Sequence, residues 1–157
     1  MIEPLIPDSW RRGGVVAVIG LGKSGVAATQ LLARNGVRVY ASDASDHPYA
    51  GEAVTALRQL SGVEVDVGRH DLAKIRQALG VVVSPGVPPD APPIAAARHA
   101  GVEIVSELDV GFRGLAAAGA ETRCIAITGT NGKTTTTALI AHLLSSAGLR
   151  ATTAGNI

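Results

Sequence analysis

Hydrophobic residues in the first 120 positions form short runs that are separated by longer stretches of mixed polarity. Val15–Ile19 and residues 81–83 are uninterrupted apolar runs, which are typical of strands buried on both faces of a parallel sheet. At Val63–Val67 valines alternate with acidic residues, so we expect a strand at the sheet edge with one face in solvent. Two further strands are predicted at residues 37–42 and 103–106.

Helical patterns fill the intervals between these strands. In the first of them Val26, Leu31 and Leu32 share one face, and Gly36 stands where a helix commonly stops. Repeated strand–helix units predict a mainly parallel sheet with right-handed crossovers and helices on both faces. We therefore expect an α/β, Rossmann-like domain with a five-stranded parallel sheet over residues 1–120. The predicted helices cover residues 24–35, 52–60, 72–79, 93–100 and 107–117.

A second domain is predicted to begin after a linker of small residues at 116–120. Residues 123–127 show an apolar strand pattern that contains the lone cysteine, Cys124, which we expect in a core. A helix with leucines and an isoleucine at helical spacing is predicted at 134–147, and another strand at 151–154. Residues 121–157 are therefore interpreted as the incomplete beginning of a larger domain.

Composition and charge narrow the class of function. The formal net charge is +1 and the basic residues are spread singly, which argues against binding to nucleic acid. No apolar stretch approaches the roughly 20 residues that cross a bilayer, and the N-terminus lacks the pattern of a signal peptide. A single cysteine suits a reducing compartment. These features predict a cytoplasmic protein that binds neither nucleic acid nor a membrane.

Between the first predicted strand and helix lies Gly20-Leu21-Gly22-Lys23-Ser24-Gly25, a G-x-G-x-x-G sequence. Such a loop lets the backbone approach a phosphate at a helix N-terminus, where unpaired N–H groups and the helix dipole favour an anion. A bound anion would offset the unfavourable position of Lys23 in the first helical turn, although solvent exposure explains it equally well. Asp43 ends the second strand, where an acidic residue often contacts a ribose. A tight turn without a ligand and a merely polar strand end are the alternatives.

The second glycine loop runs from Thr128 to Thr134 between the strand and helix predicted for the second domain. Ile127 stands where the strict G-x-x-x-x-G-K-[ST] pattern has its first glycine, but the Gly-Lys-Thr core is intact. In such a loop backbone N–H groups surround phosphate oxygens, Lys133 reaches the β- and γ-phosphates, and the Thr134 hydroxyl contacts Mg²⁺. We therefore predict that Lys133 is catalytic and Thr134 a magnesium ligand. The predicted ATP-binding residues are Gly129, Thr130, Asn131, Gly132, Lys133, Thr134 and Thr135.

A third candidate is Ser84-Pro85-Gly86, at the carboxyl end of a predicted buried strand. Open parallel sheets bind ligands at this edge, but an ordinary Pro-Gly turn is the simpler explanation on physical grounds alone. The histidines have no spacing that suggests a metal site, and we expect all of them on the surface or on helix faces: His47, His70, His99 and His142.

In combination these motifs resemble the Mur ligase family of cell-wall enzymes, and most closely its D-glutamate-adding branch. A Gly-Thr-Asn-Gly-Lys-Thr loop without the usual first P-loop glycine is characteristic of that family. The resemblance extends along the whole chain in order, through Gly20-Leu21-Gly22-Lys23-Ser24-Gly25, Ser84-Pro85-Gly86, Ser106-Glu107-Leu108, the loop from Gly129 to Thr136, and Gly155-Asn156-Ile157.

The resemblance implies a Rossmann-like domain for a UDP-sugar, a central ATPase domain and a C-terminal domain for an amino acid. This chain would carry the first domain and the start of the second, at residues 121–157. The first loop would then hold UDP rather than NAD, with Lys23 and Ser24 near the diphosphate and Asp43 near the uracil. Ala44-Ser45 lacks the cationic residue that some relatives place against the uracil. The implied substrate-binding residues are Gly22, Lys23, Ser24, Asp43, Ser84, Pro85, Gly86 and Asn156.

The implied reaction joins D-glutamate to UDP-N-acetylmuramoyl-L-alanine through an acyl phosphate, with ATP and Mg²⁺, in peptidoglycan precursor synthesis. The full-length enzyme is expected to be a monomer. An NAD-dependent dehydrogenase is one alternative, but it would have no use for the second loop. A non-catalytic UDP-sugar-binding module is another. The 157-residue chain alone is expected to be inactive, because one strand, a loop and one helix cannot bury an ATPase core.

Overall fold

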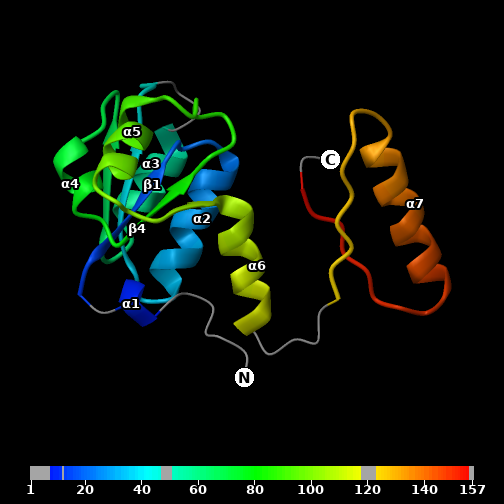
Figure 1. The fold of residues 1–157 in the computed structure, drawn as a ribbon. Coiled ribbons are helices and arrows are strands. Elements are labelled where there is room, and N and C mark those ends of the chain that lie inside the picture. Colours follow the sequence, from blue (N-terminus) through cyan, green and yellow to red (C-terminus); the bar gives the residue numbers. More distant parts are fainter. Residues whose placement is uncertain (1–7, 12, 47–50, 118–122, 156–157) are drawn as a thin grey trace. The chain divides into compact units, whose positions relative to one another are not determined.

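The computed structural model describes residues 8–11, 13–46, 51–117 and 123–155. The chain divides into two compact units, Met1–Glu121 and Thr122–Ile157, and each has its own architecture (Figure 1).

The first unit is built on a sheet that has five strands within the described residues, and all neighbouring strands are parallel (Figure 1). The predicted parallel five-stranded sheet is confirmed. The order β3-β2-β1-β4-β5 places β4 directly beside β1, so the loops that follow these two strands lie at one edge of the sheet. The strands are β1 (Val15–Ile19), β2 (Arg38–Asp43), β3 (Val63–Val67), β4 (Gly80–Val83) and β5 (Ile104–Ser106).

Helices cover both faces of this sheet. They are α1 (Asp8–Arg11), α2 (Lys23–Arg34), α3 (Gly51–Arg58), α4 (Leu72–Arg76), α5 (Pro92–His99) and α6 (Glu107–Ala117). Alternate residues of a strand point to opposite faces, so β1 contributes to two cores. Val18 packs in one core cluster with Leu32 of α2, whereas Ile19 packs in the other with Ile75 of α4 and Ala97 of α5.

The sequence patterns are explained by the position of each strand. β1 lies in the middle of the sheet and is almost entirely buried, as its uninterrupted apolar run predicts. β3 lies at the edge, where Val65 is buried and Glu64 is exposed, so the edge position predicted from its alternation is confirmed. Gly36, just past α2, has a φ of +77°, a conformation that glycine adopts at little cost.

The second unit contains the helix α7 (Lys133–Ser146), which confirms the predicted helix to within one residue at each end. The strands predicted at 123–127 and 151–154 are wrong for this structure, because the described residues 123–132 and 147–155 form no strand. A strand is defined by hydrogen bonds to a neighbouring strand, and no such pairing occurs in the described part of this unit.

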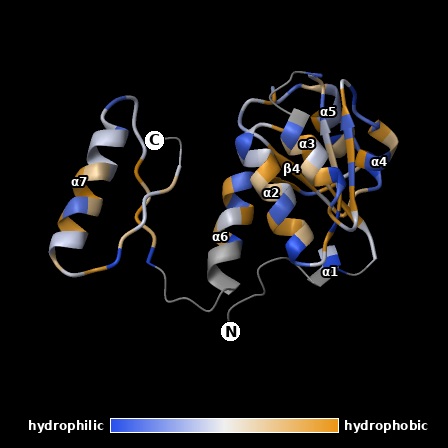
Figure 2. Cartoon of the chain, turned by 180° about the vertical axis from the view of Figure 1, so that it is seen from behind, coloured by the Kyte–Doolittle hydropathy of each residue, from blue (hydrophilic) through white to orange (hydrophobic). Residues whose placement is uncertain are grey.

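Apolar side chains of the second unit are consequently exposed. Leu139 and Leu143, on one side of α7, are 56% and 58% exposed, and no described residue of α7 is buried. Figure 2 shows hydrophobic and hydrophilic colours alternating along α7. Cys124 is also exposed, so the expectation that it lies in a core is wrong. Its apolar neighbours predicted burial, but the described residues of this unit form no strand that could cover them.

Candidate functional site

The first glycine loop connects β1 to α2 and is held by the ends of neighbouring strands. The Gly20 N–H donates to the Ser42 carbonyl oxygen at 2.8 Å, and the Leu21 N–H donates to Asp43 Oδ2 at 2.6 Å. Gly20 has a φ of +94°, which allows the chain to turn sharply out of β1. At Gly25 a Cβ atom would lie 1.9 Å from the Gly20 carbonyl oxygen. The third glycine of the motif therefore permits close packing of α2 on the loop.

The N-terminus of α2 is open to a ligand. Its N-cap, Gly22, has no side chain that could cap the helix, and no atom lies within 4 Å of where its Cβ would be. Gly22, Lys23 and Ser24 are all exposed. The first N–H groups of the helix therefore face solvent next to a lysine, an arrangement that suits an anionic group.

Asp43 is half-buried at the end of β2, where it fixes backbone as well as carrying charge. One carboxylate oxygen accepts the Leu21 N–H and the other accepts the Ser45 N–H at 2.8 Å. Each carboxylate oxygen can accept more than one hydrogen bond, so both remain able to bind a ligand donor. The carboxylate thus ties the first glycine loop to the turn after β2.

Ser84-Pro85-Gly86 follows β4 and lies against the first glycine loop, as the position of β4 beside β1 requires. Ser84 is buried, and its Oγ lies 2.9 Å from the Gly20 carbonyl oxygen. Pro85 and Gly86 are exposed. Of the substrate-binding residues predicted from the sequence, the structure brings this turn, Asp43 and the loop residues together at one edge of the sheet. Asn156 lies outside the described residues.

Two residues that contact this site were not predicted as site residues. Glu107, the first residue of α6, accepts a hydrogen bond from the Ser84 hydroxyl. His70 follows β3, and its Nδ1 lies 2.9 Å from Oγ of the buried Ser42. His70 is half-buried, so the expectation that it is a surface or helix-face residue is wrong. The sequence signals were the place of Glu107 in the Ser106-Glu107-Leu108 stretch, directly after β5, and the place of His70 in the loop that follows β3.

A hydrogen-bonded cluster of polar and charged groups lies on β2 and β3 and in the loop that contains His70. Its members are Tyr40, Asp66, Arg69 and Asp71. Burial raises the pKa of Tyr40, whose hydroxyl donates to Asp66 Oδ2 at 3.0 Å and accepts the Asp71 N–H at 2.7 Å. Burial alone would raise the pKa of Asp66, but hydrogen bonds from Tyr40 and Arg69 outweigh it and lower that pKa. Burial lowers the pKa of the His70 imidazole, and the charge of Asp43 opposes this effect. Burial of the ring therefore favours a neutral imidazole beside the site.

The second glycine loop precedes α7 and is exposed throughout its described length. Gly129 and Gly132 have φ values of +150° and +77°, and Gly132 is the N-cap of α7 without a side-chain cap. The Lys133 ammonium donates to the carbonyl oxygens of Gly129, at 2.6 Å, and Thr130, at 3.4 Å. The lysine thus lies over the loop next to uncapped N–H groups, and Thr134 and Thr135 are exposed in the first turn.

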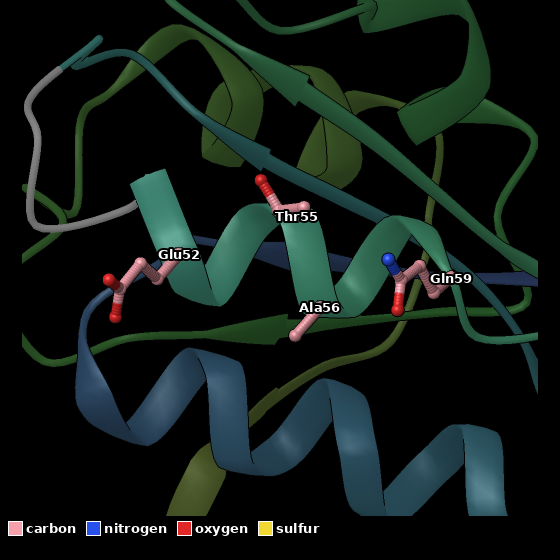
Figure 3. A pocket seen from close by; sticks show the side chains of 4 residues that line it. All are labelled: Glu52, Thr55, Ala56 and Gln59. Carbon is pink, nitrogen blue, oxygen red and sulfur yellow. The ribbon is translucent and has the colours of Figure 1, made fainter.

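A cavity of about 370 Å³ lies along α3 and is lined by Glu52, Thr55, Ala56 and Gln59 (Figure 3). These residues lie on α3 or, for Gln59, directly after it, and none belongs to a glycine loop or to the turn after β4. We therefore do not place the functional site in this cavity.

The described residues contain neither a metal-binding cluster nor a membrane-spanning helix. No group of three or more His, Cys, Asp or Glu side chains there could hold a metal ion, and no helix there is long and apolar enough to cross a bilayer.

Comparison with known proteins connects both loops to one family. Residues 14–106 match the family model "Mur ligase MurD-like, N-terminal domain", and residues 127–157 match "Mur ligase middle domain". UDP-N-acetylmuramoylalanine–D-glutamate ligase of Chromobacterium violaceum is 47% identical over 90% of this chain and 30% of its own length. The enzyme of the same name from Frankia casuarinae is 44% identical over 95% of this chain and 30% of its own length.

A solved structure is also similar, that of a pseudomurein peptide ligase type C from Methanothermus fervidus. It has a TM-score of 0.54 and 25% identity, and the match covers 87% of this chain and 27% of that one. The chain thus spans about 30% of the length of the curated relatives that it matches.

Proposed function

The chain belongs to the Mur ligase family, in its MurD-like branch, and on this premise we propose that it is the opening part of an ATP-dependent amide-bond ligase. The ligase adds D-glutamate to UDP-N-acetylmuramoyl-L-alanine during peptidoglycan precursor synthesis, as the names of its relatives indicate for them. ATP phosphorylates the alanyl carboxylate, and the amine of D-glutamate displaces the phosphate. The domain boundary falls near residues 120–121.

The observation that carries this proposal is the presence of two uncapped helix N-termini, each after a glycine loop and each next to a lysine. An uncapped helix N-terminus offers N–H donors and a partial positive charge to an anion. One such site suits a nucleotide, and two in one chain suit an enzyme that binds two phosphorylated ligands. A dehydrogenase would need only the first.

The UDP-sugar would bind at the edge of the sheet in the first unit where the loops after β1, β2 and β4 lie. Gly22, Lys23 and Ser24 would contact the diphosphate, because they are exposed at the N-terminus of α2. Asp43 would contact the uracil, and residues 84–86 would lie beside the sugar. Asn156 is carried over from the resemblance alone.

The nucleotide side uses the second glycine loop. The residues there fit ATP, because the N–H groups of Lys133, Thr134 and Thr135 have no side-chain cap and the Lys133 ammonium already lies over the loop carbonyls. Gly129, Thr130, Asn131 and Gly132 would surround the phosphates. Thr134 would supply one oxygen ligand to Mg²⁺, a cation that retains several waters and phosphate oxygens as its other ligands. When bound, Mg²⁺ would neutralise charge on the transferred phosphoryl group.

The setting of this activity follows from the substrates. Both are small molecules of the cytoplasm, so we place the ligase there, acting as a monomer without nucleic acid or membrane partners. The 157-residue chain by itself is proposed to bind the UDP-sugar but not to catalyse the reaction.

Calorimetric titration of the 157-residue chain tests the ligand of the first unit. Saturable binding of UDP-N-acetylmuramoyl-L-alanine, without binding of NAD, is expected. Lys23→Gln should weaken the UDP-sugar by about threefold, since one charge near a helix N-terminus contributes a modest amount. Arg34→Gln removes an exposed charge from the other end of α2 and should leave affinity unchanged. Saturable binding of NAD together with no detectable binding of the UDP-sugar would overturn the proposal.

A further inference from the structure

The Ser84 hydroxyl occupies space that the glycines of the first loop leave free. A Cβ at Gly20 would lie 2.7 Å from the Ser84 Cβ and 2.9 Å from its Oγ, and a Cβ at Gly25 would lie 3.0 Å from the same Oγ. The first and third glycines of the motif thus accommodate this serine as well as the turn itself. Ser84 is only 7% exposed, so its side chain is poorly placed to touch a ligand directly.

Two acceptors compete for the hydrogen of this hydroxyl. Ser84 Oγ lies 2.9 Å from the Gly20 carbonyl oxygen and also contacts Glu107 Oε1. A hydroxyl has one hydrogen, so it can donate to only one of them at a time. Glu107 therefore influences both the position of Oγ and how strongly it binds the Gly20 carbonyl.

The backbone that carries Glu107 is itself fixed. Ser106 and Asp109 form a reciprocal cap at the start of α6, in which the Ser106 N–H donates to Asp109 Oδ2 at 3.0 Å and the Asp109 N–H donates to Ser106 Oγ at 3.1 Å. Val110, one residue further along, is buried in the core. The Glu107 side chain thus extends from a rigid helix start toward the glycine loop.

From this geometry we infer that Glu107 is a positioning residue for the nucleotide substrate. It holds the Ser84 side chain in the space left by Gly20 and Gly25, and by competing for the one hydroxyl hydrogen it sets how the Gly20 carbonyl is hydrogen-bonded in the backbone that leads into α2. Glu107 acts through Ser84 and does not touch the ligand. This inference rests on the proposed function, because it takes the ligand of the first loop to be the UDP-sugar.

Affinity for UDP-N-acetylmuramoyl-L-alanine, measured by calorimetry on the 157-residue chain, tests this role. Glu107→Ala should weaken binding by about tenfold, the upper end of what one intramolecular hydrogen bond contributes, because Ser84 Oγ loses the contact that holds it against the loop. Glu107→Gln should stay within about threefold of the parent, because the amide N–H can donate to Ser84 Oγ and leave the hydroxyl hydrogen for Gly20. Glu103→Gln is the matched control, since Glu103 pairs with Arg113 of α6 on the surface, and it should have no effect.

A double-mutant cycle separates this role from an independent structural one. If Glu107 acts through Ser84, Ser84→Ala combined with Glu107→Ala should bind no more weakly than the weaker of the two single variants. Additive losses would overturn the inference, and so would parent-like binding by Glu107→Ala. In a full-length ligase Glu107→Ala should raise the KM for the UDP-sugar while kcat and the KM for ATP stay unchanged. An equal change in both KM values would mean a general structural defect and would also overturn it.

A second readout does not depend on the identity of the ligand. The backbone amide NMR signals of Gly20 and Leu21 should shift in Glu107→Ala and return toward the parent in Glu107→Gln, without any ligand present. If the parent chain fails to bind the UDP-sugar, the proposed function fails, and these shifts still decide the positioning role. Unchanged Gly20 and Leu21 signals in Glu107→Ala would overturn it.

Discussion

The two units each present a glycine loop before a helix, but the loops are held in different ways. In the first unit the backbone of Gly20 and Leu21 is bonded to the ends of β2, and Ser84 packs against it from β4. In the second unit the only polar side chain in hydrogen-bond contact with the loop carbonyls, among the described residues, is Lys133 itself. The first loop is therefore shaped by a surrounding sheet, whereas the second is shaped by its own sequence.

Because the loops are held differently, glycine is required for a different physical reason in each of them. A side chain at Gly25 would collide with backbone, whatever its conformation. At Gly132, by contrast, no atom lies within 4 Å of an added Cβ, and only the φ of +77° favours glycine. Glycine is thus required by close packing at Gly25 in the first unit and by backbone conformation at Gly132 in the second.

The largest expected effect concerns the chemistry assigned to the second unit. In a full-length ligase that contains this chain, Lys133→Ala should lower kcat by about 10² to 10³, the usual cost of removing one group that stabilises charge in the transition state. Binding of the UDP-sugar should stay within about twofold, because Lys133 contacts only its own loop among the described residues. Steady-state kinetics and calorimetry measure the two effects.

Retention of more than a tenth of the parent kcat would contradict the role of Lys133. Loss of UDP-sugar binding in the same variant would show that the two loops do not act separately.

A smaller effect is expected from Gly25→Ala, which tests the packing of the first loop. The added Cβ would lie 1.9 Å from the Gly20 carbonyl oxygen, so the backbone must move. Overpacking of this kind typically costs about 1–3 kcal/mol, or a decrease in Tm on the order of 10 °C for a unit of this size. Gly22→Ala is the matched control, because its φ is −69° and no atom lies within 4 Å of the new Cβ. Thermal unfolding followed by circular dichroism should separate them, and equal Tm values would refute the packing argument.

The two units also show what a sequence reveals about a fold. The uninterrupted run of β1 and the alternation of β3 predicted both their existence and their places in the sheet, because burial on two faces or one leaves a direct mark on composition. The apolar run around Cys124 was equally clear, yet no strand forms there. An apolar run shows that a segment is able to form a buried strand. Whether the strand forms depends on another segment that offers it backbone hydrogen bonds.

In the candidate site, too, the sequence predicted the residues of a local motif but not the contacts between distant segments. Gly20, Gly25 and Asp43 belong to a spaced motif, so the sequence predicted that they would serve one nucleotide ligand. Glu107, at the start of α6, and His70, in the loop after β3, reach the site through single hydrogen bonds, to Ser84 and Ser42. Such contacts join residues more than 20 positions apart and follow no spacing rule, so only the three-dimensional arrangement shows them.

The smallest expected effect is a pH dependence in the stability of the first unit. Burial lowers the pKa of His70 below its ordinary value of 6.5, although the nearby Asp43 carboxylate acts in the opposite direction. The unfolded chain therefore binds the proton more readily, and stability should fall as the pH drops from about 6.5 toward the folded-state pKa. His70→Asn removes the titration while its amide can still bond to Ser42 Oγ. The Tm of the parent should decrease by a few degrees more than that of the variant between about pH 7.5 and pH 5.5. The other histidines are common to both proteins and cancel in this difference. Identical pH profiles would contradict a lowered pKa of His70 in the folded chain.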